Sequence, residues 1–285
     1  MYFVPSHTPG HLPLSRDIAD YPEGIILPVD KPYRWTSADV IRKLKYAAFR
    51  HFGKKNLKVG HAGTLDPLAT GVLLVCIGAA CKRAQELQDH DKEYIARIRF
   101  GATTPSYDLE KEVDRHFPYT HITREAVAAA LPPFLGEQEQ VAPLFSAKSV
   151  DGVRAYELAR KLYRSGRTAE LDAAALDTLQ RNRINISELE LLEFIPGGSA
   201  PSVIPSEASV SPSSRIHVAD TASLGLPEAV VRIACSKGTY IRAFARDLGE
   251  ALGSGAHLSG LVRSRSGDFR LSDALSVDEA LEWLQ

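Results

Sequence analysis

Residues 58–75 read KVGHAGTLDPLATGVLLV, a glycine-rich loop that leads directly into a strongly apolar strand. Gly60 and Gly63 permit backbone conformations that are closed to other residues, and they let a ligand approach closely. The proline after Asp66 fixes the turn at the one carboxylate of this stretch. The continuous apolar run Val72–Gly78 predicts a strand that is covered on both faces. The sequence therefore predicts that a constrained loop presents Asp66 at a strand edge, where a carboxylate can act as nucleophile, general base or metal ligand.

An isolated Asp-Pro pair in a glycine-rich loop more often only closes a turn. Here the whole string argues for a site, because GHAGTLDPLATGVL resembles the catalytic motif of the TruB family of tRNA pseudouridine synthases. Four further stretches support the resemblance in the expected order: LPVDKPYRWTS (27–37), DKEYIARIRFG (91–101), QVAPLFSAKSVDGVRAYELAR (140–160) and CSKGTYIRAFARDLGEALGSGAHLSGLVRS (235–264). The resemblance covers residues 24–275, with gaps.

The resemblance implies the pseudouridine synthase fold, an α+β (mixed α/β) architecture with a central, mostly antiparallel mixed sheet flanked by helices. The pattern agrees, since helices and strands alternate without the strict βαβ rhythm of a doubly wound sheet. We expect an N-terminal arm (1–23) and a catalytic domain (24–285) that carries an RNA-gripping insertion (121–183). Many bacterial members add a C-terminal PUA domain, for which the chain leaves no room. Recognition of tRNA is then expected to rest on the core and the insertion.

Local patterns place the elements along the chain. Period-2 alternation or apolar runs predict strands, and period-3.6 patterns with polar caps predict helices. Tyr94–Phe100 alternates with Arg97 and Arg99, which predicts a strand with one basic face. The segment 196–227 is rich in Ser, Pro and Gly and predicts a flexible loop between two paired strands. The remaining expectations are strands at Gly24–Val29, Ile184–Phe194 and Ala229–Ser236, and helices at Ala38–Phe52 (capped by Thr36 or Ser37), Ala80–Gln88, Ile122–Phe134 and Val153–Ser165.

The resemblance also implies roles for single residues. Asp66 is the catalytic carboxylate, Tyr94 stacks on the target base, and Arg242 pairs with Asp66. The other positions that match substrate-binding residues of the family are His61, which faces the RNA, Tyr240 and Leu261, which wall the uracil pocket, and Lys31, which stands in a Lys-Pro motif beside the site.

Each role has a structural alternative. A tyrosine at a strand start is more often a core aromatic whose hydroxyl is satisfied, and this applies to Tyr94. Arg242 could bond a helix terminus or a neighbouring carboxylate instead of Asp66. A lone loop histidine such as His61 is more often a structural hydrogen bonder, and Tyr240 and Leu261 would otherwise be interpreted as core residues.

The charge distribution suggests RNA-facing surfaces even though the net charge is -1. Nine Lys and Arg residues lie between Lys31 and Lys58 against Asp39 alone, immediately before the Asp66 loop. This run is either a phosphate-binding surface or the solvated face of a helix. A second basic cluster falls within residues 154–167. The residues expected to contact the RNA backbone are Lys54, Lys55, Lys58, Lys82, Lys148, Arg154, Arg160 and Lys161.

Other features restrict compartment and chemistry. The chain has no apolar run long enough for a membrane span and no signal-peptide pattern, so a cytoplasmic location is expected. Cys76, Cys81 and Cys235 have no metal-site or disulfide spacing and are expected to be buried small hydrophobes. We expect a monomer whose partner is the T arm of tRNA.

The activity implied by the resemblance is isomerisation of uridine 55 in the T loop of tRNA to pseudouridine. The base is flipped out, Asp66 assists cleavage of the glycosidic bond, and the uracil rejoins through C5. Attack at C1′, attack at C6 and elimination through a glycal remain open. Since nothing is oxidised and no group comes from outside, no cofactor, metal or nucleotide is implied. The alternatives are a synthase that acts on another structured RNA, including through a guide RNA, and an RNA-binding or tRNA-folding factor.

Overall fold

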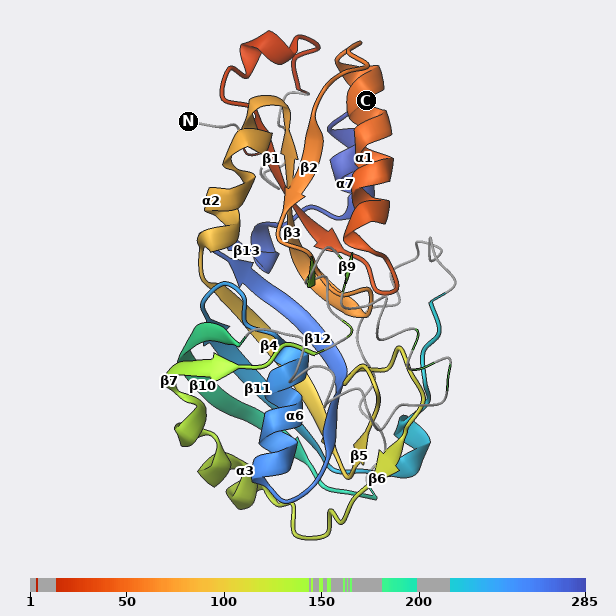
Figure 1. Ribbon diagram of the computed structural model, residues 1–285. Coiled ribbons are helices and arrows are strands. Elements are labelled where there is room, and N and C mark those ends of the chain that lie inside the picture. Colours follow the sequence, from red (N-terminus) through yellow and green to blue (C-terminus); the bar gives the residue numbers. More distant parts are fainter. Residues whose placement is uncertain are drawn as a thin grey trace. The chain divides into compact units, whose positions relative to one another are not determined.

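The computed structural model describes residues 4, 14–143, 145, 149–150, 153–154, 161, 163, 165, 181–198 and 216–285 (Figure 1). The chain forms two compact units, each built from separate stretches of sequence. The first unit comprises residues 1–94, 205–216 and 262–285, and the second comprises residues 95–204 and 217–261. No helix in the described part of the chain is long and apolar enough to cross a membrane.

Three strands form the centre of the first unit: β1 (Ile25–Lys31), β2 (Val59–Ala62) and β3 (Ala69–Ile77). β3 pairs antiparallel with both of the others, with Ile25 opposite Ile77 on one side and Ala62 opposite Leu74 on the other. Every residue of β3 except Thr70 is buried, which explains its continuous apolar sequence and confirms the predicted doubly covered strand.

Helix α1 (Ser37–His51) begins where the sequence predicts. The Thr36 hydroxyl accepts a bond from Asp39 N at 3.1 Å, and the Asp39 carboxylate accepts one from Thr36 N at 3.0 Å, which completes a capping box. Val40, Leu44 and Ala48 are buried on the inner face. The other elements of this unit are η1 (Ile18–Asp20), η2 (Gly78–Arg83), α2 (Ala84–Asp89), β13 (Phe269–Arg270), η6 (Leu271–Asp273) and α7 (Val277–Glu282).

The second unit contains a sheet in the order β4 (Lys92–Phe100, from Ile95 onward), β11 (Glu228–Cys235), β10 (Asn182–Ile195) and β7 (Gly136–Gln140). β10 pairs antiparallel with both β11 and β7. The predicted long-looped hairpin of the strands on either side of segment 196–227 is therefore confirmed. Strand β12 (Ala256–Ser266) contributes residues 256–261 to this unit and residues 262–266 to the first.

Helices and short strands complete the second unit. The predicted helix at Ile122–Phe134 is present as α3 (Arg124–Ala130) followed by η3 (Pro132–Phe134). Phe134 packs edge-to-face on Phe244 of α6 (Ile241–Ala251), with ring centroids 5.3 Å apart. The remaining elements are β5 (Ala102–Thr103), β6 (Arg115–His116), β8 (Ser149–Val150), β9 (Val153–Arg154) and η5 (Ala222–Leu224).

The start of the predicted helix at Val153–Ser165 is wrong. Val153 and Arg154 form strand β9, and Val153 pairs with Val150 of β8. The intervening Asp-Gly sequence favours a two-residue hairpin connection, and this local preference outweighs the helical spacing that follows. Further along, Lys161 and Tyr163 are helical, as predicted.

The basic face predicted for β4 is present, but it points inward. Arg97 Nε donates to Glu228 Oε1 at 2.9 Å, and Arg99 donates to Glu228 Oε2 at 2.7 Å. Ser259 Oγ also donates to Glu228 Oε2, at 2.6 Å. The two arginines therefore share one buried carboxylate inside the unit and are not presented as a basic outer face.

The end of the predicted flexible loop at 196–227 is ordered structure. Arg99 donates to the Thr221 hydroxyl at 2.7 Å, and Thr221 is buried. Ala219 N donates to Leu109 O at 2.8 Å, and η5 follows directly. Residues 217–227 are thus attached to the rest of the second unit, and the Thr221 hydroxyl serves as an acceptor for a buried arginine.

Candidate active site

Asp66 lies on the loop between β2 and β3 in the first unit and is half-buried. Ala69 N donates to Asp66 O at 3.1 Å and closes the turn. Gly63, which begins the loop, and Gly71, within the start of β3, have φ angles of 94° and 100°. A Cβ at Gly71 would overlap the backbone of Arg263, so this position excludes every side chain. The expectation for Gly63 is confirmed, whereas Gly60 faces open space and its backbone is not left-handed.

Lys31 supports this loop from β1. Its side chain is fully buried, and Nζ donates to Trp35 O at 2.6 Å, to Pro32 O at 3.0 Å and to Pro67 O at 3.2 Å. Burial lowers the pKa of Lys31 to about 7, although the nearby Asp66 and Asp30 carboxylates oppose that shift. Lys31 therefore holds the carbonyl of the residue directly after Asp66.

Arg263 holds the same loop from β12. It is 1% exposed, and its Nε donates to Val72 O at 2.7 Å. Its two terminal nitrogens donate to Gly63 O at 3.2 Å and Thr64 O at 3.4 Å. The planar guanidinium thus joins the beginning of the loop to the strand that follows it. Sequence reasoning missed this role; the one available signal is an arginine that interrupts the apolar strand sequence LV-R.

Ser37 adds a third attachment. Its hydroxyl accepts from Leu65 N at 3.0 Å and lies 3.3 Å from Leu65 O, to which it can donate. Ser37 is the first residue of α1, and Leu65 immediately precedes Asp66. The helix start therefore fixes the backbone on the amino-terminal side of the carboxylate.

His61 lies on β2 and is half-buried. Burial lowers its pKa, and the positive charge of Arg263 adds to that shift. Its Nδ1 is a buried atom without a hydrogen-bond partner within the described residues. A neutral imidazole with an unused ring nitrogen can bond a ligand that approaches the loop, because buried polar atoms are normally paired.

In the second unit, Arg242 occupies the first turn of α6 and donates to Ser106 O at 3.1 Å and Phe145 O at 2.9 Å. Its Nε lies 3.8 Å from Asp108 Oδ2, and both side chains are 7% exposed. The sequence-based alternative of a neighbouring carboxylate is therefore realised by Asp108. Sequence reasoning missed Asp108, whose separation from Arg242 along the chain gives no local signal.

Tyr240 is the residue before α6, and Gln140 anchors its backbone. Gln140 Nε2 donates to Tyr240 O at 3.1 Å, and Tyr240 N donates to Gln140 Oε1 at 2.8 Å. Gln140 is the last residue of β7 and is 4% exposed. Both polar ends of the amide are thus used to set the position of Tyr240, a role that the sequence did not indicate.

Comparison with known proteins identifies the family. Residues 50–196 match the family described as TruB family pseudouridylate synthase (N terminal domain). A tRNA pseudouridine synthase B of Phocaeicola vulgatus is 50% identical over 265 residues, which cover 93% of this chain and 95% of that protein. This chain belongs to the TruB family. A protein of the same name from Bacteroides fragilis is 47% identical and covers 93% of this chain and 96% of its own.

The fold agrees with that assignment. A chain in the crystal structure of a Cbf5-Nop10-Gar1 complex aligns with a TM-score of 0.58 at 23% identity, over 97% of this chain and 60% of that chain. The predicted pseudouridine synthase fold, with its mixed sheet and flanking helices, is therefore confirmed.

The TruB site residues divide between the two units. The first unit holds Asp66, Lys31, His61 and Tyr94, which lies near the start of β4. The second holds Arg242, Tyr240 and Leu261, which is half-buried on β12. The pairing of Asp66 with Arg242 and the uracil pocket walled by Tyr94, Tyr240 and Leu261 stay predictions.

The residues predicted to contact the RNA backbone vary in exposure. Four exposed lysines belong to the first unit: Lys54, Lys55, Lys58 and Lys82. Lys161 is exposed in the second unit, and Arg154 belongs to β9. Lys148 and Arg160 lie outside the described residues.

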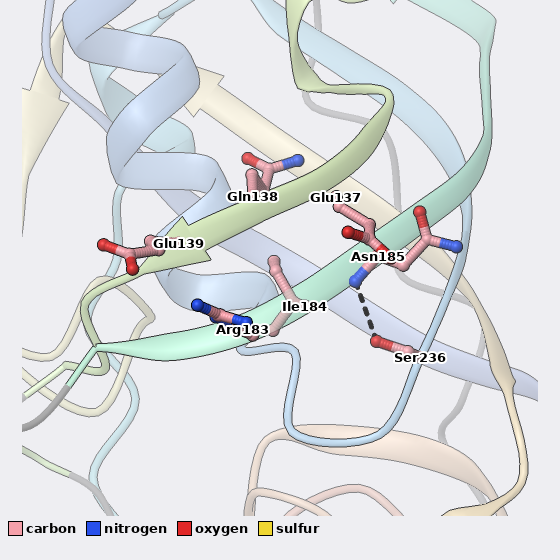
Figure 2. Close-up of a pocket in the computed structure, with 7 residues that line it drawn as sticks. All are labelled: Glu137, Gln138, Glu139, Arg183, Ile184, Asn185 and Ser236. Carbon is pink, nitrogen blue, oxygen red and sulfur yellow. Dashed lines mark hydrogen bonds between the residues drawn. The ribbon is translucent and has the colours of Figure 1, made fainter.

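A pocket of about 420 Å³ lies over β7 and β10 in the second unit (Figure 2). Asn185 N donates to Ser236 Oγ at 2.8 Å along its wall. The residues that line this pocket are Glu137, Gln138, Glu139, Arg183, Ile184, Asn185 and Ser236. None of the predicted TruB site residues is among them, and two carboxylates disfavour an approaching phosphate. This pocket is therefore separate from the predicted uridine site.

Proposed function

We propose that this chain converts uridine 55 in the T loop of tRNA to pseudouridine. The single observation that carries the proposal is the Asp66 loop. Its backbone is fixed by Lys31, Arg263 and Ser37, so the carboxylate is presented with little freedom to move. Relatives named tRNA pseudouridine synthase B, which match 93% of this chain, support tRNA as the substrate.

The reaction must begin by taking the uridine out of its loop. Unstacking and flipping a nucleotide costs a few kcal/mol, which phosphate contacts and a new stacking partner offset. Tyr94 is the stacking partner in our proposal. The exposed lysines Lys54, Lys55, Lys58 and Lys82 supply phosphate contacts on the first unit.

The chemistry then requires only the uridine and the enzyme. The bond from C1′ to N1 breaks, the uracil rotates, and a bond from C1′ to C5 forms while C5 loses its proton and N1 gains one. Asp66 assists the first step by attack at C1′, by attack at C6 or as the base of an elimination. Confinement by Tyr94, Tyr240 and Leu261 keeps the detached uracil in place.

Arg242 is the expected partner of Asp66, and its position is fixed within its own unit. Ser106 O, Phe145 O and Asp108 hold the guanidinium. A cation that is already oriented can stabilise a carboxylate without reorganisation during the reaction. We further propose that the protein works as a monomer in the cytoplasm.

The test is tritium release from C5-labelled uridine in an unmodified tRNA transcript. Wild type is expected to release tritium, and Asp66→Asn is expected to release none. Asp278→Asn is the matched control, because Asp278 is an exposed carboxylate 3.8 Å from Lys43. A transcript with cytidine at position 55 should release nothing. Equal release by Asp66→Asn, or equal release from the cytidine transcript, would contradict the proposal.

A further inference from the structure

The outer face of α1 carries an exposed stripe of alternating cations and aromatic rings. We define the α1 stripe as Lys45, Tyr46, Phe49 and Arg50. Lys45 and Phe49 are four residues apart, as are Tyr46 and Arg50, so the four side chains share one face of the helix. Tyr46 is 66% exposed, more than any other large hydrophobic residue in the described part of the chain. The opposite face of the same helix provides the core residues, so Tyr46 and Phe49 are not needed to bury it.

The aromatic rings of the stripe are held by neighbouring cations. Lys45 Nζ lies 5.4 Å from the centre of the Phe49 ring, and the guanidinium of Arg50 lies 5.9 Å from the centre of the Tyr46 ring. Such contacts keep the rings on the helix surface and leave the cations exposed to solvent. Lys45 and Arg50 are both exposed.

The stripe is also strongly positive. The sequence has no Asp or Glu from residue 40 to residue 65. Asp39, the one carboxylate of α1, caps the helix and binds Arg42 at 2.9 Å. Directly after the helix, Lys54 and Lys55 extend the positive surface. An anionic partner with flat apolar groups is therefore complementary to this face.

RNA has that chemistry. Its phosphates bind lysine and arginine, and an unpaired base stacks on an exposed aromatic ring with little regard to sequence. An acidic protein segment would satisfy the charges but would leave the tyrosine ring without a flat partner. The observations therefore favour RNA.

We propose that the α1 stripe is a second RNA-docking surface, where Lys45 and Arg50 bind phosphates and Tyr46 stacks on an unpaired base. This inference rests on the proposed function for the identity of the RNA. Ser37, at the other end of α1, contacts the residue before Asp66. At about 1.5 Å per residue, Tyr46 lies about 14 Å further along the helix axis. The stripe therefore holds a nucleotide other than the one that is isomerised.

The test is equilibrium binding of an unmodified tRNA transcript at several salt concentrations. Tyr46→Ala is expected to raise the Kd by about fivefold or more, whereas Tyr46→Phe, which keeps the ring, should stay near wild type. The double variant Lys45→Gln/Arg50→Gln should lower the slope of log K against log salt by about 1.5. Arg232→Gln is the matched control for charge, because Arg232 is already paired with Glu188 and Glu190.

The two proposals fail in different ways. Wild-type Kd and salt slope in both Tyr46→Ala and the double variant would overturn the docking surface, whatever the turnover. Weakened binding by these variants, in a protein that releases no tritium, would support the docking surface and contradict the proposed function. Because all three side chains are exposed, the variants should unfold at the temperature of wild type.

Discussion

The side chain of Gln140 and the backbone of Tyr240 form a reciprocal pair of hydrogen bonds, with distances of 2.8 Å and 3.1 Å. Gln140 ends an edge strand, and Tyr240 immediately precedes α6, which carries Arg242. The amide thus uses both its donor and its acceptor on the backbone of Tyr240. It therefore helps to position both Tyr240, a predicted wall of the uracil pocket, and Arg242, the predicted partner of Asp66.

Gln140→Glu should reduce turnover and stability together. The new carboxylate has no N–H group to donate to Tyr240 O. This buried carbonyl would therefore lose its hydrogen bond and would be repelled by the carboxylate oxygen that replaces the amide nitrogen. We expect a loss of about 1–3 kcal/mol in the free energy of unfolding and a fall in kcat of about tenfold. Gln85→Glu on the exposed surface of α2 is the control. Turnover of Gln140→Glu equal to that of the control would contradict this role.

Arg263→Lys should impair the Asp66 loop while tRNA binding persists. Arg263 uses a different nitrogen for each of Val72 O, Thr64 O and Gly63 O, whereas a lysine has all its donors on one nitrogen and would lose part of this set. We expect single-turnover rates to fall about 10- to 100-fold, with a Kd within about threefold of wild type. Arg265→Lys on the same strand is the control, since within the described residues the Arg265 side chain donates only to Gly267 O, at 3.2 Å. A normal rate in Arg263→Lys would show that the clamp is dispensable.

Asp108→Asn should weaken catalysis through Arg242. The variant keeps the shape of the side chain but removes the buried negative charge 3.8 Å from Arg242 Nε. Breaking a buried pair typically costs about 3–5 kcal/mol of stability, and the arginine loses an orienting partner. Tritium release and urea unfolding measure the two effects. Asp114→Asn is the control, because Asp114 accepts from the Thr103 hydroxyl at 2.8 Å and forms no ion pair with an arginine within the described residues. An unchanged rate would contradict the positioning of Arg242 by Asp108.

His257 should make the protein less stable in acid. Its Nδ1 lies 2.8 Å from Ala102 O, and its Nε2 lies 3.1 Å from the Thr221 hydroxyl. Burial lowers its pKa from 6.5 to about 4, so the unfolded chain binds the proton more strongly between these values. The contribution of His257 to the free energy of unfolding is fully present above pH 6.5. As the pH falls toward 4, about 2–3 kcal/mol of that free energy is lost.

Urea unfolding of wild type and His257→Gln at pH 7 and pH 4.5 tests whether acid lowers stability through this histidine. The variant has no titrating imidazole, so its free energy of unfolding should change less between the two pH values. It should also be less stable than wild type at pH 7, since buried bonds are altered. An equal acid-induced loss in both proteins would remove His257 as the cause.

Local signals in the sequence predicted the elements around Asp66. The apolar run of β3, the Thr36 cap of α1 and the glycine at position 63 each act within a few residues, so sequence alone reveals them. The same reasoning missed Gln140, Asp108 and Arg263. Their roles depend on single side chains that meet backbone or charge far along the chain, and such meetings leave no periodic pattern.

The same limit explains the inward face of β4. Alternation shows that Arg97 and Arg99 share one side of the strand, but it does not show what covers that side. Glu228, which pairs with both arginines, lies on a strand more than a hundred residues later. The helix predicted to begin at Val153 departs from the structure for a different reason, because Val153 and Arg154 pair locally with Val150 and Ser149.

Gly71 determines how closely two strands approach beside the loop. Because it has no side chain, the backbone of Arg263 lies directly against it, and the guanidinium then reaches across to Val72 O and back to Gly63 O. Any larger residue at position 71 would move the arginine's anchor point away from the loop it holds. Because the overlap is with backbone atoms of position 263, no exchange of the arginine side chain would make room for a side chain at position 71.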